Sequence, residues 1–520
     1  MTDVRLFADG AADHDPLSPE LSFAAATARI RNGDAASIMP APATLWRLGR
    51  TARYALSLCG RSAELPDFHP QDHHELREPF ARHLNELRAR LADTPVRIDE
   101  PSPALRELLE KYDAALDADN RANLLRLLGA LTDGCFIGPQ TFHLDVSNLC
   151  NTNCIFCGLH SPLLIEPQKP MRGRRFTEGW KTRRIDYEIF ETLVDDLAAI
   201  GTREDILFSG EGEPLTHPRI VEMIRKVRGK GQRLTVFSNG LLVDEKISDL
   251  FVEVDLDIFY WSLSAASPAT FAKQQPAHGA EKFAPMVRAI KELARKKNAK
   301  NRKPYIILAH VINRLNAHEV EGAMDMALEV GVDAVRYQIM HSCGASFDDL
   351  LITKEQHAAV EAQLQRARRK AEAAGVEIVA NIEFQLPQAG KTFELSPDVL
   401  PFHWSRDLYS QTGCLAGWFF GRAFSDGRLS FCCHDKIVGS LYRGRFADIW
   451  FSERYRKLRQ AAKAFDLSVN PELIEENCGG PLLGPDCDYC GNYEFINQAL
   501  CDLDDLQLRP LLRKDPPTWP

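Results

Sequence analysis

The sequence predicts an α/β protein built around a partial (β/α)6 barrel, with a helical N-terminal domain and a small cysteine-rich C-terminal domain. Three observations support this fold class. From residue 141 onward, short apolar runs alternate with stretches of helical periodicity, which is typical of βα units with parallel strands. Between about 40 and 132 the apolar residues follow helical spacing alone. Beyond residue 413 the chain becomes rich in cysteine.

The alternating region contains about six βα units, which suit an open barrel with right-handed connections. The expected strands are 141–147, 204–209, 233–238, 255–263, 304–312, 333–340 and, as a seventh candidate, 376–383. The expected helices are 187–200, 217–229, 243–251, 279–296, 317–330 and 353–374. In such barrels the functional residues lie at the carboxyl ends of the strands.

Composition divides the chain into five segments. Residues 1–140 form the helical N-terminal domain, for which packing or partner binding is the simplest role. The remaining segments are the barrel (141–385), a proline-containing linker (386–413), the cysteine-rich domain (414–501) and a tail (502–520).

The overall composition narrows the functional classes. The chain has 520 residues and a net charge of −9, so a globally basic nucleic-acid-binding protein is disfavoured. No apolar run is long enough to span a membrane, and the first residues lack a secretory signal. With 13 cysteines and no signal, metal or redox chemistry in a reducing cytoplasm is favoured over disulfides. We therefore expect a cytoplasmic protein that has no membrane partner.

Three cysteines, Cys150, Cys154 and Cys157, lie within eight residues directly after the first expected strand. Three thiolates can hold three irons of a 4Fe–4S cluster and leave the fourth iron open. A structural zinc ion would need a fourth ligand, for which His160 is the only nearby candidate. Three buried free cysteines are the remaining alternative.

The spacing Cys-x3-Cys-x2-Cys, with Phe156 before the last cysteine, closely resembles the radical SAM superfamily. The resemblance implies that the amino and carboxylate groups of S-adenosylmethionine (SAM) chelate the open iron. It also implies that an electron donor such as flavodoxin or ferredoxin reduces the cluster. Cleavage of SAM then yields a 5′-deoxyadenosyl radical, which abstracts hydrogen from a substrate.

The end of the second strand resembles the Gly-Gly-Glu motif of the same family. On that resemblance, Gly212 and Glu213 hold the methionyl amine of SAM. The chain departs from the motif in one respect, because Glu211 separates Gly210 from Gly212. A simple glycine-rich turn is the alternative interpretation.

Later strand ends also resemble SAM contacts of the family. Ser238 and Asn239 are suited to the ribose hydroxyls, although an Asn-Gly turn explains them equally well. Ser264 is the better of two serines near the end of the fourth strand. Asn313 follows the fifth strand and is the candidate for the SAM carboxylate or ribose, whereas Asn316 is equally suited to capping the next helix.

A long insert, 158–186, separates the cysteine loop from the next helix. Its basic residues are Lys169, Arg172, Arg174, Arg175, Lys181, Arg183 and Arg184. One hypothesis is that this insert covers an anionic substrate at the mouth of the barrel. A solvated surface loop is the alternative.

A second group of cysteines begins at Cys414 and continues with Cys432 after a hairpin with an Asp-Gly turn. Together with Cys487 and Cys490, this pattern resembles the C-terminal extensions called SPASM and Twitch in radical SAM enzymes. A full SPASM pattern would show further cysteines five and three residues beyond Cys490, whereas here only Cys501 follows. We therefore expect the shorter, Twitch-like form with one auxiliary 4Fe–4S cluster, and a structural zinc ion is the competing interpretation. Three more cysteines could replace a ligand: Cys433, Cys478 and Cys501.

The resemblance implies a radical SAM oxidoreductase or maturase that abstracts hydrogen from its substrate. A polar, and on the insert hypothesis anionic, small molecule that is oxidised or epimerised is the preferred substrate class. A maturase that modifies a ribosomal peptide or a protein side chain is the alternative, and a non-catalytic metal scaffold is a third class. The sequence singles out no catalytic acid or base.

Overall fold

The computed structural model describes ten segments of the chain: residues 122, 125–126, 129–130, 134–164, 179–300, 302–340, 345–380, 413–433, 436–464 and 476–477. Almost all of the expected N-terminal domain and linker lies outside these segments, as do Cys487 and Cys490. Within the described segments, no helix is long and apolar enough to cross a membrane.

One sheet organises the described part of the molecule. Its 11 strands lie in the order β11-β10-β9-β8-β1-β2-β3-β4-β5-β6-β7. The strands of the parallel half are β1 (Thr141–Asp145), β2 (Asp205–Ser209), β3 (Leu234–Ser238), β4 (Ile258–Ser262), β5 (Tyr305–Ile312), β6 (Ala334–Ile339) and β7 (Glu377–Ala380). Each pairs in parallel with its sequence neighbours, which confirms the predicted α/β fold with a parallel sheet.

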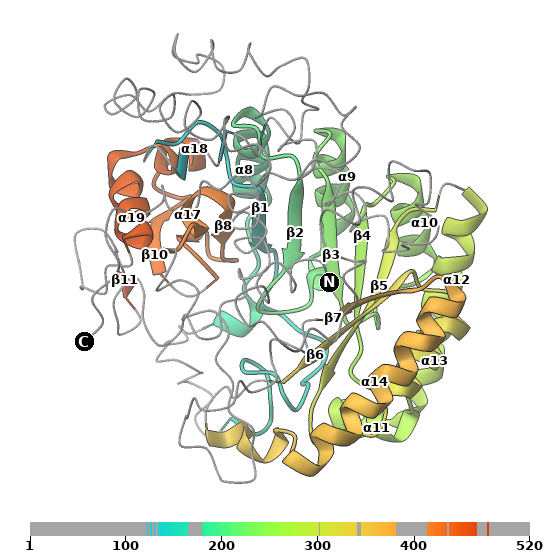
Figure 1. Ribbon diagram of the computed structural model, residues 1–520. Coiled ribbons are helices and arrows are strands. Elements are labelled where there is room, and N and C mark those ends of the chain that lie inside the picture. The colour runs from blue at the N-terminus through green and yellow to red at the C-terminus, as the bar shows by residue number, and fades with distance from the viewer. Residues whose placement is uncertain are drawn as a thin grey trace, which may run out of the picture.

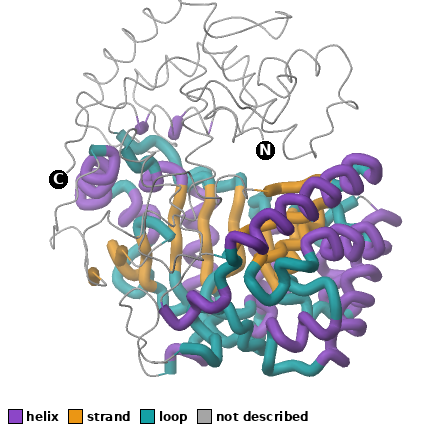
Figure 2. Tube along the Cα trace, turned by 60° about the horizontal axis from the view of Figure 1, so that its bottom comes forward, coloured by secondary structure: helices purple, strands orange, loops and turns teal. Residues whose placement is uncertain are grey.

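Helices connect these strands. They are α8 (Tyr187–Ala199), α9 (Ile220–Gly229), α10 (Glu245–Glu253), α11 (Pro268–Gln274), α12 (Phe283–Lys300), α13 (Val320–Val330) and α14 (Lys354–Ala374). Short 3-10 turns lie at η6 (Trp180–Thr182), η7 (Pro214–Thr216), η8 (Ala280–Lys282) and η9 (Ala345–Leu350). Helices α12, α13 and α14 pack side by side along the sheet (Figure 1). In Figure 2 the strands run side by side through the molecule, and many of the helices gather beside them.

All seven expected strands and all six expected helices occur within a few residues of the predicted positions. Helix α11 was not predicted. The residues at its start are nevertheless typical of a helix N-terminus. Ser267 is the N-cap, where its hydroxyl accepts from the amide of Thr270, and Pro268 occupies the first helical position. The helix has only seven residues, too few for a clear apolar period, so periodicity alone could not reveal it.

The C-terminal segment continues the same sheet. Its elements are α17 (Ala416–Phe419), β8 (Phe420–Ala423), β9 (Arg428–Ser430), β10 (Lys436–Ser440), α18 (Phe446–Trp450), α19 (Glu453–Lys463) and β11 (Glu476–Asn477). Strand β8 pairs in parallel with β1, while β9 and β10 follow in antiparallel order. Figure 1 shows β8 directly beside β1. The first strand of the barrel is therefore flanked by the C-terminal segment on one side and by β2 on the other.

Apolar packing and buried polar groups fix this junction. The rings of Phe142 on β1 and Phe446 on α18 meet edge to face with centroids 4.9 Å apart. The indole of Trp450 donates a hydrogen bond to the carbonyl of Ile137 at 3.0 Å. On the outer side, the guanidinium of Arg445 pairs with the carboxylate of Asp196 on α8, with 2.9 Å between Nε and Oδ1.

Candidate functional site

The cysteine loop follows β1 at the carboxyl edge of the parallel sheet, the position where such folds place their chemistry. Cys150, Cys154 and Cys157 are all partly exposed as residues. Burial of the sulfur atoms raises the pKa of Cys150 and of Cys154 to about 12 and raises that of Cys157 as well. The protein alone therefore keeps these thiols protonated, and a bound metal would have to supply the positive charge that stabilises three thiolates.

Hydrogen bonds to sulfur fit a metal-bound state of this loop. The backbone amides of Leu159 and His160 both donate to the sulfur of Cys157 at 3.4 Å. Hydrogen bonds of this kind accompany thiolates that ligate iron–sulfur clusters. Within the described segments, no three His, Cys, Asp or Glu side chains converge closely enough to hold a single metal ion. A 4Fe–4S cube binds each thiolate to a different iron, whereas a structural zinc ion draws four ligands to one point.

His160 is already engaged elsewhere. Its Nε2 lies 2.7 Å from the carbonyl oxygen of Glu211, and because a carbonyl only accepts, this nitrogen must carry the hydrogen. Burial lowers the pKa of His160 to about 4, so the ring is neutral. The ring also lies against Trp180, with centroids 5.5 Å apart. With Nε2 engaged in this hydrogen bond, Nδ1 is the ring nitrogen that would bind a zinc ion.

The loop after β2 packs directly on the base of the cysteine loop. A Cβ atom at Gly212 would lie 2.5 Å from the carbonyl carbon of Asn148 and 2.6 Å from the oxygen of Leu149, so only glycine fits. The amide of Glu213 donates to the same Leu149 oxygen at 2.9 Å. The structure thus brings Gly212 and Glu213 next to the first cysteine, as the family resemblance requires.

The carboxylate of Glu213 is buried and fixed by the backbone. It accepts hydrogen bonds from the amide of Leu215 at 3.1 Å and from the amide of Asn239 at 2.8 Å. Burial raises the pKa of Glu213 to about 7, although these hydrogen bonds and one from Ser238 lower it. An ammonium group placed beside this carboxylate would restore its ordinary acidity and would gain a strong hydrogen bond.

Asn239 and Ser238 hold the turn after β3. The Nδ2 of Asn239 donates to Asn151 in the cysteine loop at 2.7 Å, while its Oδ1 accepts from the amide of Leu241 at 3.0 Å. The hydroxyl of Ser238 accepts from the amide of Gly240 at 3.0 Å. The structure therefore shows the turn-forming contacts that the sequence left open as the alternative, and a ribose contact remains a prediction.

Ser264 and Asn313 are bound to neighbouring protein groups. The hydroxyl of Ser264 accepts from the amide of Val311 at 3.1 Å. Asn313 and Gln274 exchange two amide hydrogen bonds, both 3.0 Å long. Asn316 does not cap the next helix, since that position is taken by Glu319; instead its Nδ2 donates to the carbonyls of Ser264 and Val311 at 2.8 Å. A role of Ser264 and Asn313 in SAM binding stays a prediction.

A segment that sequence reasoning missed supports the cysteine loop from its other side. The amide of Ile155 donates to the carbonyl of Gln274 at the end of α11, 2.8 Å away. Asn153 accepts from the amide of Ala277 at 2.6 Å. The ring nitrogen Nε2 of His278 lies 2.8 Å from the carbonyl of Asn151.

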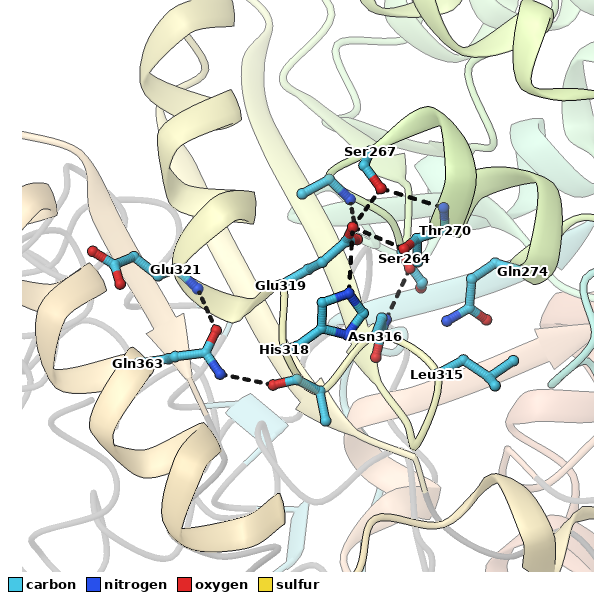
Figure 3. Close-up of polar contacts among 12 residues, drawn as sticks. Ser264, Ser267, Thr270, Gln274, Leu315, Asn316, His318, Glu319, Glu321 and Gln363 are labelled. Carbon is cyan, nitrogen blue, oxygen red and sulfur yellow. Dashed lines mark hydrogen bonds and ion pairs between the residues drawn. The ribbon is translucent and has the colours of Figure 1, made fainter.

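Glu319 anchors that segment to the barrel. Its carboxylate accepts from the amide of Ala266 at 2.7 Å, the hydroxyl of Ser267 at 2.5 Å and the hydroxyl of Thr270 at 2.8 Å. Figure 3 shows these groups converging on Glu319 from the start of α11. No local motif marks Glu319 in the sequence, because its partners lie about 50 residues earlier in the chain.

A polar cluster joins the cysteine loop to the C-terminal segment. We call it the junction cluster, and it consists of Asp145, Trp180, Glu211 and Arg422. Arg422 on β8 donates to Asp145 at the end of β1, 2.7 Å away, and lies 3.7 Å from the carboxylate of Glu211. The indole of Trp180 donates to the same Glu211 carboxylate at 2.9 Å.

The structure describes only part of the proposed second ligand set. Cys414 is buried, and its amide donates to the carbonyl of Ala462 at 2.9 Å. Cys432 is partly buried against the core just after β9. The spare Cys433 follows it, and its carbonyl oxygen accepts from Arg422 at 2.6 Å. Cys487 and Cys490 lie outside the described residues, so a shared site for these four cysteines stays a prediction.

The described end of the basic insert lies along the cysteine loop. Arg184 forms an antiparallel bridge with Ser147, just before that loop. Arg183 faces Asp426 in the C-terminal hairpin, with 3.4 Å between their charged atoms. Arg174 and Arg175 lie outside the described residues, and the substrate hypothesis for the insert stays a prediction.

Comparison with known families agrees with this site. Residues 144–327 match the model of the radical SAM superfamily, and residues 414–478 match the model of the SPASM iron–sulfur cluster-binding domain. These two matches confirm the predicted resemblance to radical SAM proteins with a C-terminal SPASM-type domain. They also imply that its cofactors are 4Fe–4S clusters and SAM.

The curated relatives are distant. The chain is 27% identical over 200 residues to the tungsten-containing aldehyde ferredoxin oxidoreductase cofactor-modifying protein of Pyrococcus furiosus. This alignment covers 37% of this chain and 49% of that protein. An Fe-coproporphyrin III synthase of Methanosarcina barkeri is 27% identical over 229 residues, 43% of this chain and 51% of that protein. The chain therefore spans about half the length of these two relatives. An AdoMet-dependent heme synthase of the same organism is 22% identical over 343 residues, 66% of this chain and 88% of that protein.

The solved structures that match this chain include Streptococcus suis SuiB bound to S-adenosylmethionine. Its TM-score is 0.47 at 11% sequence identity, and the match covers 87% of each chain. A second is anSMEcpe with bound AdoMet, with a TM-score of 0.44 at 13% identity, covering 72% of this chain and 98% of that one.

Proposed function

We propose that this chain, which is a radical SAM protein with a C-terminal SPASM-type domain, cleaves SAM reductively and abstracts hydrogen from a polar small molecule. The observation that carries this proposal is the adjacency of two features. The three-cysteine loop and the buried carboxylate of Glu213 meet at the carboxyl edge of the sheet, joined through the hydrogen bond between Glu213 and Leu149. When bound, the cluster and SAM supply the radical chemistry.

The chain's own residues hold and orient the reactants. Cys150, Cys154 and Cys157 are the proposed ligands of the first cluster, and backbone amides directed at Cys157 favour its thiolate form. Glu213 is the proposed acceptor for the amine of SAM. Its carboxylate needs no reorganisation to do so, because two backbone amides already fix it.

The C-terminal cysteines are the proposed ligands of the auxiliary cluster. We assign this role to Cys414, Cys432, Cys487 and Cys490. The SPASM match ends at residue 478, before the last two of these cysteines, so their part in the site rests on the Cys-x2-Cys spacing alone.

The proposed substrate is a polar, anionic small molecule that is oxidised or epimerised. The names of curated relatives support a small molecule, because they refer to a cofactor, to coproporphyrin and to heme. The basic insert supports negative charge on the substrate. Neutralising Arg174, Arg175 and Arg184 together should then raise the KM for substrate far more than it changes SAM cleavage without substrate. Arg183 is left intact because it faces Asp426.

Anaerobic reconstitution with iron, sulfide, SAM and dithionite tests the proposal. We expect 5′-deoxyadenosine to form, and its absence from a fully loaded protein would mean that the chain is a non-catalytic scaffold. Adding a peptide-free metabolite extract should increase 5′-deoxyadenosine formation. Stimulation only by the peptide fraction would instead identify a maturase of ribosomal peptides or protein side chains.

A further inference from the structure

Glu211 occupies the position at which this chain departs from the paired glycines of the family motif, and its side chain is buried. Its carboxylate accepts from Trp180, and its carbonyl oxygen accepts from His160, the residue three positions after Cys157. The preceding Gly210 has a φ of +114°, and a Cβ there would lie 1.8 Å from Asp145. The backbone just before Glu211 therefore lies directly against Asp145, and a side chain at position 210 would not fit there.

Arg422 meets this carboxylate from the C-terminal segment. One guanidinium nitrogen donates to Asp145 and lies 3.7 Å from Glu211, and the other donates to the carbonyl of Cys433 at 2.6 Å. The guanidinium also lies over the ring of Phe424, 4.3 Å from its centroid. A single side chain therefore links the second cysteine group, the first strand and the loop that carries Glu213.

The junction cluster contains two buried carboxylates that depend on the charge of Arg422. The side chains of Asp145 and Glu211 are 0% and 1% exposed, and that of Arg422 is 11% exposed. Removing the guanidinium would leave two carboxylates close together in a poorly solvated site, which is strongly unfavourable. A shift of Glu211 away from Asp145 would relieve this repulsion, and Gly212 and Glu213, the next two residues, would then move with it. Those two residues contact the backbone just before Cys150.

We propose that Arg422 and Glu211 are positioning residues that hold Glu213 against the cysteine loop, and that they thereby couple the C-terminal cysteine group to SAM binding. This inference rests on the proposed function. Neither residue contacts SAM in this scheme; each acts through the backbone of Gly212 and Glu213. The coupling gives a physical reason for a glutamate where the family motif has glycine, since a glycine would offer Arg422 and Trp180 nothing to bind.

The test compares Arg422→Met and Arg422→Lys with the control Arg445→Met in the full-length, reconstituted protein. Arg445 also joins the C-terminal segment to the barrel, but it does so through Asp196 on α8, away from the cysteine loop. SAM affinity is measured by equilibrium dialysis and by the change that SAM causes in the electron paramagnetic resonance spectrum of the reduced cluster. The KM for SAM and the kcat of SAM cleavage are measured separately.

We expect Arg422→Met to raise the Kd and KM for SAM by roughly 10- to 100-fold, the effect of losing a charge-assisted hydrogen bond, while kcat at saturating SAM changes little. Arg422→Lys should recover part of the loss, and Arg445→Met should retain the SAM affinity of the wild type. An unchanged Kd in Arg422→Met, or an equal rise in Arg445→Met, would overturn the inference. A wild-type protein that makes no 5′-deoxyadenosine would instead defeat the proposed function.

A double-mutant cycle covers the case in which Arg422→Met fails to fold. Glu211→Gln keeps an acceptor for Trp180 and removes one of the two carboxylates. If the cluster acts as proposed, adding Glu211→Gln to Arg422→Met restores folding, or brings SAM affinity closer to the wild type than Arg422→Met alone. A double variant that remains unfolded, or strictly additive effects in folded variants, would contradict the coupling.

Discussion

The two cysteine groups of this chain differ in how their ligands are brought together. In the first group, three cysteines lie within eight residues, and neighbouring turns hold the loop through backbone hydrogen bonds. In the second group, 17 residues that include a hairpin separate Cys414 from Cys432. The other two proposed ligands, Cys487 and Cys490, follow more than 50 residues after Cys432. Local spacing thus identifies the first site, whereas the second depends on how distant segments meet.

The supports of the two groups differ as well. The cysteine loop is held on one side by the junction cluster and on the other by Gln274, His278 and the anchor at Glu319. The described ligands of the second group instead rest on the C-terminal segment itself, as the bond between Cys414 and Ala462 shows. Arg422 bridges the two groups. The following predictions test how independent they are.

The largest effect is expected from replacing Cys150, Cys154 and Cys157 together by alanine. Formation of 5′-deoxyadenosine should fall below detection, because no ligands remain for the first cluster. About four irons and four sulfides per chain should remain if the second group holds its own cube. Zinc in place of that iron would refute the auxiliary cluster. Cys135→Ala, at a buried cysteine outside both groups, is the control and should keep the full iron content.

Replacing Cys414 or Cys432 by alanine should have the next largest effect. Iron should fall from about eight to about four per chain, because one cube loses a ligand. Cleavage of SAM should persist at saturating SAM, whereas turnover of substrate should be lost. Complete loss of SAM cleavage despite an intact first cluster would show that the two groups are not separate sites. Cys433→Ala is the matched control, and an equal loss of iron there would identify Cys433 as the ligand.

Glu213→Gln should weaken SAM binding by roughly 10- to 100-fold, because the amine loses a charged acceptor while the shape of the side chain is kept. The measurement is the Kd for SAM in the iron-loaded protein. Glu222→Gln, on the exposed side of α9, is the control and should bind SAM normally. An unchanged Kd in Glu213→Gln would remove this residue from the SAM site.

The smallest effect concerns the pH dependence of stability in the metal-free protein. The pKa of Glu213 is raised from 4.5 to about 7 by burial, so between these values the folded chain binds more protons at this site than the unfolded chain does. Its contribution therefore lowers the free energy of unfolding as pH rises from about 4.5 to about 7. Glu213→Gln lacks this loss and should gain stability relative to the wild type over the same interval. Denaturant titrations at several pH values would measure it, and a constant difference would contradict the assignment.

Much of the fold and part of the site could be predicted because the signals are local. The apolar periods gave seven strands and six helices near their observed positions, since each period reflects the burial of one face of one element. The first three cysteines lie within one loop, so their spacing is a local signal. Gly212 belongs to the next βα unit and packs on the backbone just before that loop.

The sequence by itself therefore determined the parallel α/β sheet and the three-cysteine loop, while the family resemblance indicated Glu213 as a SAM contact, which stays a prediction. Only the tertiary structure decided that β8 pairs with β1 and that Arg422 meets Glu211, and it also brought the end of α11 into contact with the cysteine loop. These contacts join residues up to 279 positions apart in the chain, as in the pairing of Thr141 with Phe420. No periodicity or spacing encodes such pairs, because each arises from the packing of complete elements against one another.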